Sequence, residues 1–289
     1  MANEQNLDDG QQMRLKSASP PSGLHGVVIP SIRRNQHHAI DSVAVRELYA
    51  GLGGAALKTL SVLSLHVPLS ERWFHRRMFD LRGAKRILDA GCGAGQLTRQ
   101  LAHYADPDAS ITACDFSVEM LLRARQRLQS FSIQFVLGDL KQLPFADASF
   151  DCITCGYAIE HLSEARLGLA ELARVLRVGG RLLLRTTEDN WTGHLTSRVW
   201  SCRAYNRQEL QYRCHEQGLI WRKELWYSSV HQHLGIGGIC VEIERQRMDS
   251  EEFRRDEQRT PVQAELSGTP VVSHILNSGV TAEILKTGG

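Results

Sequence analysis

The chain lacks the long apolar runs and the excess of charge that mark two large classes of protein. None of its apolar stretches reaches the roughly 18–20 residues that a membrane-spanning helix needs. Its formal net charge is only +2 at pH 7 over 289 residues, which does not favour a nucleic-acid-binding protein. No internal repeat is visible, so a solenoid is not expected. With an ordinary hydrophobic fraction of 42%, the composition predicts a globular protein.

A secretory signal and a disulfide framework are missing as well. The polar residues 1–26 lack the order of a basic, an apolar and a small-residue segment. Seven cysteines, an odd number spread through the expected strands and helices, indicate free thiols in a reducing compartment. We therefore expect a cytoplasmic protein.

Two short cysteine and histidine patterns fall short of a metal site. Cys152 and Cys155 form a C-x-x-C on an expected strand, where residues three apart point to opposite faces, so we interpret them as buried apolar residues. His231 and His233 would share the face of a strand, but the spacing places no third ligand. We interpret them as paired surface or pocket histidines and expect no metal.

The most informative segment is residues 87–95, Ile-Leu-Asp-Ala-Gly-Cys-Gly-Ala-Gly, followed by a helix-like stretch from Gln96 to Tyr104. This order predicts a strand, a tight turn and the start of a helix. Its glycines stand at alternate positions: Gly91, Gly93 and Gly95. Glycine permits positive φ and lets a ligand approach the backbone, while a helix start offers free N–H groups. Such a turn can hold an adenosine-type cofactor, although a lone glycine-rich loop is also compatible with an ordinary strand–helix turn.

The spacing of the glycines helps to choose the cofactor. The dinucleotide fingerprint is G-x-G-x-x-G, and here the third glycine comes one residue too early. Asp89, just before the first glycine, would repel an anionic pyrophosphate. The same carboxylate suits the sulfonium and ammonium of S-adenosylmethionine, which is the cofactor that we expect.

Further acids follow the next expected strands. Ser110–Asp115 ends in a carboxylate that can accept both hydroxyls of a ribose. Ile133–Leu137 leads into Gly138 and Asp139, where an acid can hydrogen-bond an adenine amino group. A fourth strand, residues 150–155, ends at Gly156. Each acid alone is typical of a solvated loop, but three in this arrangement favour a cofactor site.

These segments together resemble the class I S-adenosylmethionine-dependent methyltransferases, in particular the branch with the ubiquinone/menaquinone and sterol C-methyltransferases. They occur in family order: residues 89–95, 114–117, 138–139, 143–145, 150–151, 159–162 and 174–180. The resemblance covers roughly residues 84–187. One departure is Val178, where the family usually has proline before Gly179 and Gly180. Because that turn lies away from the cofactor, we expect a small effect on stability only.

The resemblance implies roles for individual residues. Asp89 and the loop residues surround the methionine end, Asp115 holds the ribose, Asp139 faces the adenine, and Gly156 borders the cofactor near its methyl group. The complete predicted cofactor-binding set is Asp89, Gly91, Cys92, Gly93, Gly95, Asp115, Phe116, Asp139, Leu140 and Gly156.

The expected fold is α/β, with a Rossmann-like seven-stranded, mostly parallel sheet, helices on both faces and an N-terminal helical extension. The predicted divisions are a disordered tail 1–39, N-terminal helices 40–82, a Rossmann-like core 84–247 and a flexible tail 248–289.

Several element boundaries are also predicted. Pro68 should end one helix, and Ser70 should begin a second with Phe74, Met78 and Leu81 on one face. Ser117 and Asn206 should cap helices, the latter in a capping box with Glu209. The remaining expected elements are a helix 163–177, a turn at Gly179-Gly180, and strands 181–186, 219–229 and 239–245.

The methyl acceptor is less well defined. A base is needed only if the acceptor loses a proton, and Tyr157 and His161 follow the fourth strand as candidate catalytic residues. A structural role for His161 is the alternative. The insertion 188–205, with Trp191, His194 and Trp200, supplies aromatic surface for a small hydrophobic, aromatic or lipid-like acceptor.

Other interpretations stay open at this point. The basic segment 72–86 is typical of a solvated helix face, with peripheral contact to an anionic membrane as the alternative. A protein or RNA methyltransferase is disfavoured because Cys-Gly-Tyr-Ala, residues 155–158, replaces an Asn/Asp-Pro-Pro-Tyr/Phe motif. A non-catalytic binding module is disfavoured by the presence of all three acids.

Overall fold

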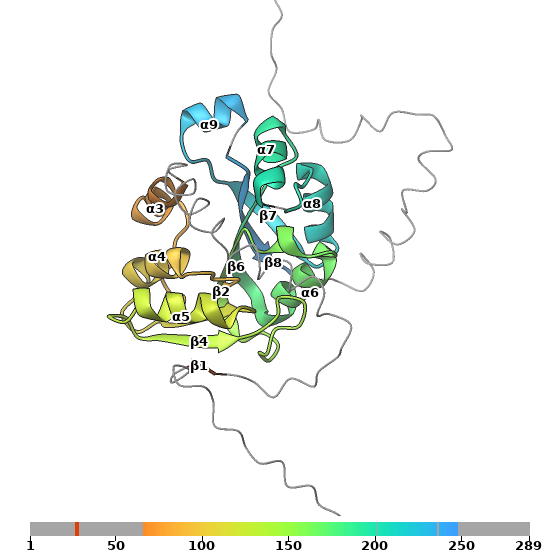
Figure 1. The fold of residues 1–289 in the computed structure, drawn as a ribbon. Coiled ribbons are helices and arrows are strands. Elements are labelled where there is room, and N and C mark those ends of the chain that lie inside the picture. Colours follow the sequence, from red (N-terminus) through yellow and green to blue (C-terminus); the bar gives the residue numbers. More distant parts are fainter. Residues whose placement is uncertain (1–26, 29–65, 201, 236, 248–289) are drawn as a thin grey trace, which may run out of the picture. The chain divides into compact units, whose positions relative to one another are not determined.

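The computed structural model describes residues 27–28, 66–200, 202–235 and 237–247 (Figure 1). The predicted flexible tail 248–289 lies outside these residues, as do nearly all of the predicted disordered tail 1–39 and the first part of the N-terminal helical region. All elements described below belong to one compact unit, Met1–Gln246. None of the helices in the described ranges is long and apolar enough to cross a membrane.

An eight-stranded sheet forms the centre of the described residues, in the order β1-β4-β3-β2-β5-β6-β8-β7. Its strands are β1 (Val27–Val28), β2 (Arg86–Ala90), β3 (Ser110–Asp115), β4 (Ile133–Leu137), β5 (Phe150–Gly156), β6 (Leu176–Thr186), β7 (Leu219–Glu224) and β8 (Ile239–Arg245). Only the pairs that include β8 are antiparallel. The mostly parallel sheet is therefore confirmed, and β1 adds an eighth strand in a segment where none was expected.

Helices cover both faces of the sheet, as predicted (Figure 1). They are α3 (His66–His75), α4 (Gln96–Tyr104), α5 (Val118–Arg127), α6 (Ala165–Val175), α7 (Trp191–Trp200), α8 (Arg207–His215) and α9 (Ser229–Leu234), with a short 3₁₀ helix η2 (Ile159–His161). Leu172 of α6 and Leu210 of α8 belong to one apolar cluster, whereas Trp73 of α3 and Leu101 of α4 belong to another. Because parallel strands are buried on both faces, their sequences are nearly continuous apolar runs.

The two cysteines of the C-x-x-C lie in these two different clusters. Cys152 packs with the α3 and α4 side, and Cys155 packs with the α6 and α8 side. Both are fully buried, and burial raises the pKa of the Cys152 thiol to about 12. The interpretation of these residues as apolar core is confirmed.

The predicted N-caps at Ser117 and Asn206 are confirmed. The Ser117 hydroxyl accepts the Met120 N–H at the start of α5, and the Asn206 side chain accepts the N–H groups of Gln208 and Glu209 at the start of α8. The predicted capping box with Glu209 is wrong: in the described residues the Glu209 carboxylate bonds to Arg213 in an i,i+4 pair and not to the Asn206 N–H.

The prediction of a helix break at Pro68 is wrong. α3 runs continuously through Pro68 and Ser70, because proline in a first helical turn removes only an N–H that has no intrahelical partner. Met78 and Leu81 lie beyond the end of α3 and not on its face. The Ser70 hydroxyl is buried against Gln100 of α4.

Two strand predictions also need correction. β6 begins at Leu176, so Gly179 and Gly180 lie inside an irregular part of the strand, where Gly179 has φ +72°. The strand expected over 219–229 ends at Glu224 and is followed by α9, which contains His231 and His233. Ser228 caps α9 through the His231 N–H, and a side-chain cap of this kind overrides a weak strand pattern.

Candidate functional site

The glycine-rich loop joins β2 to α4 at the carboxyl ends of the parallel strands, where ligands bind in open α/β sheets. Gly91, Gly93 and Gly95 all have positive φ, of 72°, 52° and 77°. A Cβ on Gly91 would lie 2.4 Å from the Cβ of Ala158, so the close approach of two loops requires glycine there. A Cβ on Gly93 would meet no atom of the described residues within 4 Å, so this backbone faces open space in that part of the chain.

Asp89 lies beneath this loop with only 1% of its surface exposed. Its two carboxylate oxygens accept hydrogen bonds from the hydroxyls of Thr98, at 2.5 Å, and Thr154, at 2.8 Å. Burial raises the pKa of Asp89, and these two hydrogen bonds oppose the rise. The carboxylate therefore joins β2, α4 and β5, and a contact with a cofactor ammonium stays a prediction. Sequence reasoning missed both threonines, although Thr98 stands in the first turn of the helix after the loop.

Asp115, at the end of β3, holds the glycine loop in place. Its carboxylate accepts the N–H of Gly93 at 2.8 Å and the N–H of Ser117 at 2.9 Å. Burial raises the pKa of Asp115 to about 6, while these backbone hydrogen bonds act to lower it. The predicted ribose ligand thus lies next to the open backbone of Gly93.

Asp139 follows β4 and is the most accessible of the three acids, with 38% of its side chain exposed. It accepts the Lys141 N–H at 2.8 Å, and the Lys141 ammonium lies 3.9 Å away. The side chains of Leu140 and Cys92 are buried in apolar clusters, whereas Phe116 is half-buried. A ligand at this site would therefore contact the backbone of Leu140 and Cys92 and not their side chains.

Beyond Gly156, the chain enters a group of aromatic residues around Arg185. Tyr157 adopts an uncommon positive φ of 58°, and its hydroxyl lies 2.8 Å from that of Tyr227. The Tyr227 hydroxyl also accepts a 2.8 Å hydrogen bond from Arg185, and its ring stacks on Trp73 at 4.8 Å. Sequence reasoning found Tyr157 but missed Trp73, Arg185 and Tyr227. The four residues come from four separate segments of the chain, so no local pattern links them.

His161 lies in η2, directly after the loop that carries Tyr157. Burial lowers its pKa, and the charge of Glu160 acts in the opposite direction. Glu160 is itself buried and accepts hydrogen bonds from the Thr186 hydroxyl at 3.0 Å and the Thr187 N–H at 2.7 Å. Glu160 thereby ties this loop to the end of β6. A catalytic role for His161 stays a prediction.

The aromatic insertion forms α7, next to α9 beyond the end of β6. The Asn190 side chain joins the two segments through a 2.8 Å hydrogen bond to the Gly235 carbonyl. Trp191 is 72% exposed, so it is not part of the core, and His194 contacts Asp189 at 3.1 Å. Trp200 is half-buried.

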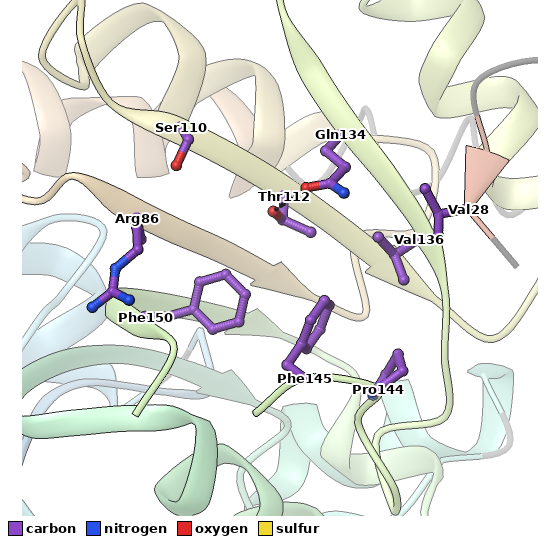
Figure 2. Close-up of a pocket in the computed structure, with 9 residues that line it drawn as sticks. All are labelled: Val28, Arg86, Ser110, Thr112, Gln134, Val136, Pro144, Phe145 and Phe150. Carbon is purple, nitrogen blue, oxygen red and sulfur yellow. Dashed lines mark hydrogen bonds between the residues drawn. The ribbon is translucent and has the colours of Figure 1, made fainter. Parts of the chain in front are cut away.

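A cavity of about 370 Å³ lies elsewhere in the described residues (Figure 2). Arg86 and Ser110, at its rim, are the first residues of β2 and β3, so it reaches the amino ends of strands whose carboxyl ends carry the glycine loop. Phe145 and Phe150 meet edge to face at 5.0 Å in its wall. Its lining contains none of the predicted site residues: Val28, Arg86, Ser110, Thr112, Gln134, Val136, Pro144, Phe145 and Phe150.

Comparison with known proteins identifies the same segment of the chain as the sequence motifs do. Residues 88–184 match the model of a family described as a methyltransferase domain, which confirms the resemblance inferred from the motifs. The demethylmenaquinone methyltransferase of Beutenbergia cavernae is 38% identical over 129 residues, which are 44% of this chain and 50% of that protein. The ubiquinone/menaquinone biosynthesis C-methyltransferase of Pseudomonas fluorescens is 34% identical over 115 residues, or 38% and 45% of the two chains. This chain thus spans about half the length of these curated relatives.

Solved structures confirm the Rossmann-like fold. A chain in the complex of the Haloferax volcanii Trm112 methyltransferase activator with a putative methyltransferase superposes with a TM-score of 0.55 at 20% identity, covering 66% of this chain and 93% of that one. A putative methyltransferase from Bacillus halodurans gives a TM-score of 0.51 at 18% identity, covering 61% and 99%.

Proposed function

We propose that this protein transfers the methyl group of S-adenosylmethionine to a small hydrophobic or aromatic acceptor. The observation that carries the proposal is the glycine loop, whose open Gly93 backbone is held by Asp115 at the carboxyl edge of the sheet. The family match over residues 88–184 supports the same activity.

The residues present suit this cofactor. Gly93 leaves room for a ligand where any side chain would fill the cradle, and α4 begins directly after Gly95. Asp115 lies beside Gly93 for a ribose, and Asp139 lies at the next strand end for an adenine. Three carboxylates at or just beyond the carboxyl ends of neighbouring strands favour a cationic cofactor over a pyrophosphate, because like charges repel.

When bound, S-adenosylmethionine supplies an electrophilic methyl group on a good leaving group, so the protein mainly has to align the acceptor and exclude water. The aromatic residues beyond Gly156 provide a dry wall on the acceptor side, since Trp73 and Tyr227 are almost fully buried. His161, whose pKa is lowered by burial, is neutral near pH 7 and can accept a proton from an acceptor that must lose one.

The acceptor class rests on the surface next to this site and on the curated relatives. Trp191 presents an exposed indole on α7, and the matched relatives are named for demethylmenaquinone and ubiquinone/menaquinone methylation. A phenolic or quinone-like molecule is therefore the first acceptor type to test.

Calorimetry tests the cofactor. We expect S-adenosylmethionine and S-adenosylhomocysteine to bind with dissociation constants in the micromolar range, and NAD to bind far more weakly. Tighter binding of NAD would refute the proposal. Incubation with methyl-labelled S-adenosylmethionine and a panel of phenols, quinols, protein and RNA then tests the acceptor. Label in protein or RNA would exclude a small acceptor, and binding without any transfer would indicate a non-catalytic module.

A further inference from the structure

Arg185 is a buried cation that forms no salt bridge with a carboxylate of the described residues. It stands near the end of β6 with 6% of its surface exposed. Its guanidinium donates a hydrogen bond from Nη2 to the Tyr227 hydroxyl at 2.8 Å and also interacts with the Cys240 thiol, whereas Nε has no partner in the described part of the chain. A buried charge without a counterion is costly, so its presence calls for a physical reason.

Aromatic rings and a thiol surround this guanidinium. Its central carbon lies 5.4 Å from the Trp73 ring, 4.9 Å from the Tyr157 ring and 5.8 Å from the Tyr227 ring. Cys240 is its neighbour on β8. Ring faces attract a cation but leave its N–H donors without acceptors, so they replace a counterion only in part. Arg185 stays charged at neutral pH: burial acts to lower its pKa, but the pKa of this guanidinium does not fall below its ordinary value, which lies far above 7.

Another arginine of the same fold shows the contrast. Arg207 lies 5.2 Å from the centre of the Trp226 ring, but it also forms 2.9 Å salt bridges with Glu188 and Glu224. An aromatic contact therefore does not by itself explain why Arg185 forms no salt bridge with an acidic residue of the described chain. Asp89 forms no salt bridge with Arg185: its oxygens bond to threonine hydroxyls, and while burial raises the pKa of Asp89, the Arg185 charge acts only at longer range to lower it.

Arg185 also lies next to the predicted position of methyl transfer. It is paired in register with Gly156 on β5, and its Cδ lies 4.0 Å from where a Cβ on Gly156 would stand. The Tyr157 N–H donates to the Arg185 carbonyl at 2.8 Å, which fixes the left-handed turn that places the Tyr157 ring against the guanidinium. A strained residue of this kind is typical of functional sites.

We propose that Arg185, with the hydroxyls of Tyr157 and Tyr227, binds a carboxylate on the methyl acceptor. This inference rests on the proposed methyl transfer and narrows its substrate class to aromatic or otherwise apolar carboxylic acids. One guanidinium matches the single negative charge and the planar geometry of a carboxylate, and phenol hydroxyls supply further donors. The three rings suit an apolar body next to that group.

The first experiment compares acids with their uncharged amides on the wild-type full chain. Benzoate, phenylacetate and 2-naphthoate are titrated by calorimetry against benzamide, phenylacetamide and 2-naphthamide, with and without saturating S-adenosylhomocysteine. We expect at least one acid to bind ten or more times more tightly than its amide. If no acid is preferred over its amide, the proposal is overturned.

The second experiment assigns the preference to Arg185. Arg185→Met should abolish the preference for the acid, and Arg185→Lys, which keeps the charge but not the planar fork, should reduce it. The matched control is Arg203→Met, because Arg203 lies 5.3 Å from the Tyr205 ring but is half-exposed and contacts Glu209. The control should keep the wild-type preference. Should Arg185→Met not fold, Arg185→Lys decides, and an unchanged preference there overturns the proposal.

The third experiment separates an acceptor carboxylate from the carboxylate of the cofactor itself. S-adenosylhomocysteine carries an amino-acid carboxylate that 5′-methylthioadenosine lacks. We expect Arg185→Lys and Arg185→Met to bind both compounds as wild type does. A tenfold loss for S-adenosylhomocysteine alone would assign Arg185 to the cofactor and overturn this inference, while the proposed methyl transfer would stand. If the wild type binds neither adenosine compound, the proposed function fails, and the acid–amide comparison without cofactor still decides whether Arg185 is an anion site.

Discussion

The cofactor side and the acceptor side of this site are built in different ways. On the cofactor side, the hydrogen bond between Gly93 and Asp115 joins residues 22 positions apart in the sequence, and the one between Thr98 and Asp89 joins residues nine positions apart. On the acceptor side, the hydrogen bond between Tyr157 and Tyr227 spans 70 residues, and the one from Trp73 to the Trp226 carbonyl spans 153. The first region follows mainly from consecutive strand–turn–helix units, with Thr154, 65 residues from Asp89, as its distant contribution, whereas the second exists only after distant segments have packed together.

The two regions also differ in charge. Buried carboxylates on the cofactor side receive hydrogen bonds from hydroxyl and backbone donors, and a buried guanidinium on the acceptor side contacts aromatic rings. A cationic donor next to the acids and an anionic acceptor next to Arg185 would each meet complementary charge. Separation of charge between the two sides of the proposed site would then orient both ligands.

The largest expected effect is on the cofactor side, where Gly91→Ala tests the packing of the loop. Its Cβ would lie 2.4 Å from Ala158 at a φ of +72°, so overpacking and backbone strain should lower the free energy of unfolding by about 2–4 kcal/mol. Gly179→Ala is the matched control, because Gly179 has the same φ but an added Cβ would have no atom of the described residues within 4 Å, and its cost should be about 1 kcal/mol. Urea denaturation measures both, and equal losses would show that the contact with Ala158 does not restrict the loop.

Asp115→Ala should lower the affinity for S-adenosylhomocysteine by at least about 10-fold, because it removes a ribose acceptor and frees the Gly93 backbone. Asp151→Ala is the control: Asp151 accepts the N–H groups of Lys85 and Arg86 at 3.0 and 2.8 Å, at the opposite edge of the sheet. Both variants should lose stability, but only the first should lose affinity in calorimetry. Unchanged binding in a folded Asp115→Ala would show that the ribose is held elsewhere.

The raised pKa of Asp115, about 6, predicts a pH dependence of binding. Ribose hydroxyls need the ionised carboxylate, so affinity for S-adenosylhomocysteine should rise with pH and level off above about pH 6, with a loss of roughly 10-fold between pH 7 and 5. For folding the sign is opposite: an acid with a raised pKa in the folded state favours folding below about pH 4, and this contribution disappears as the pH rises through 6. Asp115→Asn should remove the step in affinity, and a step that persists would assign it to another group.

The smallest effect is expected for Trp191→Ala on the acceptor side. Because Trp191 is 72% exposed, the free energy of unfolding should change by no more than about 0.5 kcal/mol. If the indole contacts the acceptor, the KM for a hydrophobic acceptor should rise while affinity for S-adenosylhomocysteine holds. Tyr212→Ala, another exposed aromatic change on α8, should alter neither quantity. Loss of stability and of both affinities together would assign Trp191 a structural role.

Local signals explain the successful predictions. The bounds of β3, β4, β8 and α4 agree with those expected, since alternating or continuous apolar residues and caps act over a few neighbouring positions. The errors occur where a signal has two meanings. Pro68 suits the first turn of a helix as well as its end, and Gly179 suits an irregular strand as well as a turn.

Apart from β1 and α9, the sequence by itself determined most of the order of strands and helices, the glycine loop and the three acids at or just beyond the carboxyl ends of their strands, because each depends on residues close together in the chain. Only the tertiary structure decided that the hydroxyls of Thr98 and Thr154 donate hydrogen bonds to the Asp89 carboxylate. It also decided that the Arg185 guanidinium lies among the rings of Trp73, Tyr157 and Tyr227. From the sequence alone, an arginine in a strand is expected to be exposed, since charge is costly to bury. Its burial depends on which rings the packing of α3, β5 and the segment after β7 brings around it, and no local pattern carries that information.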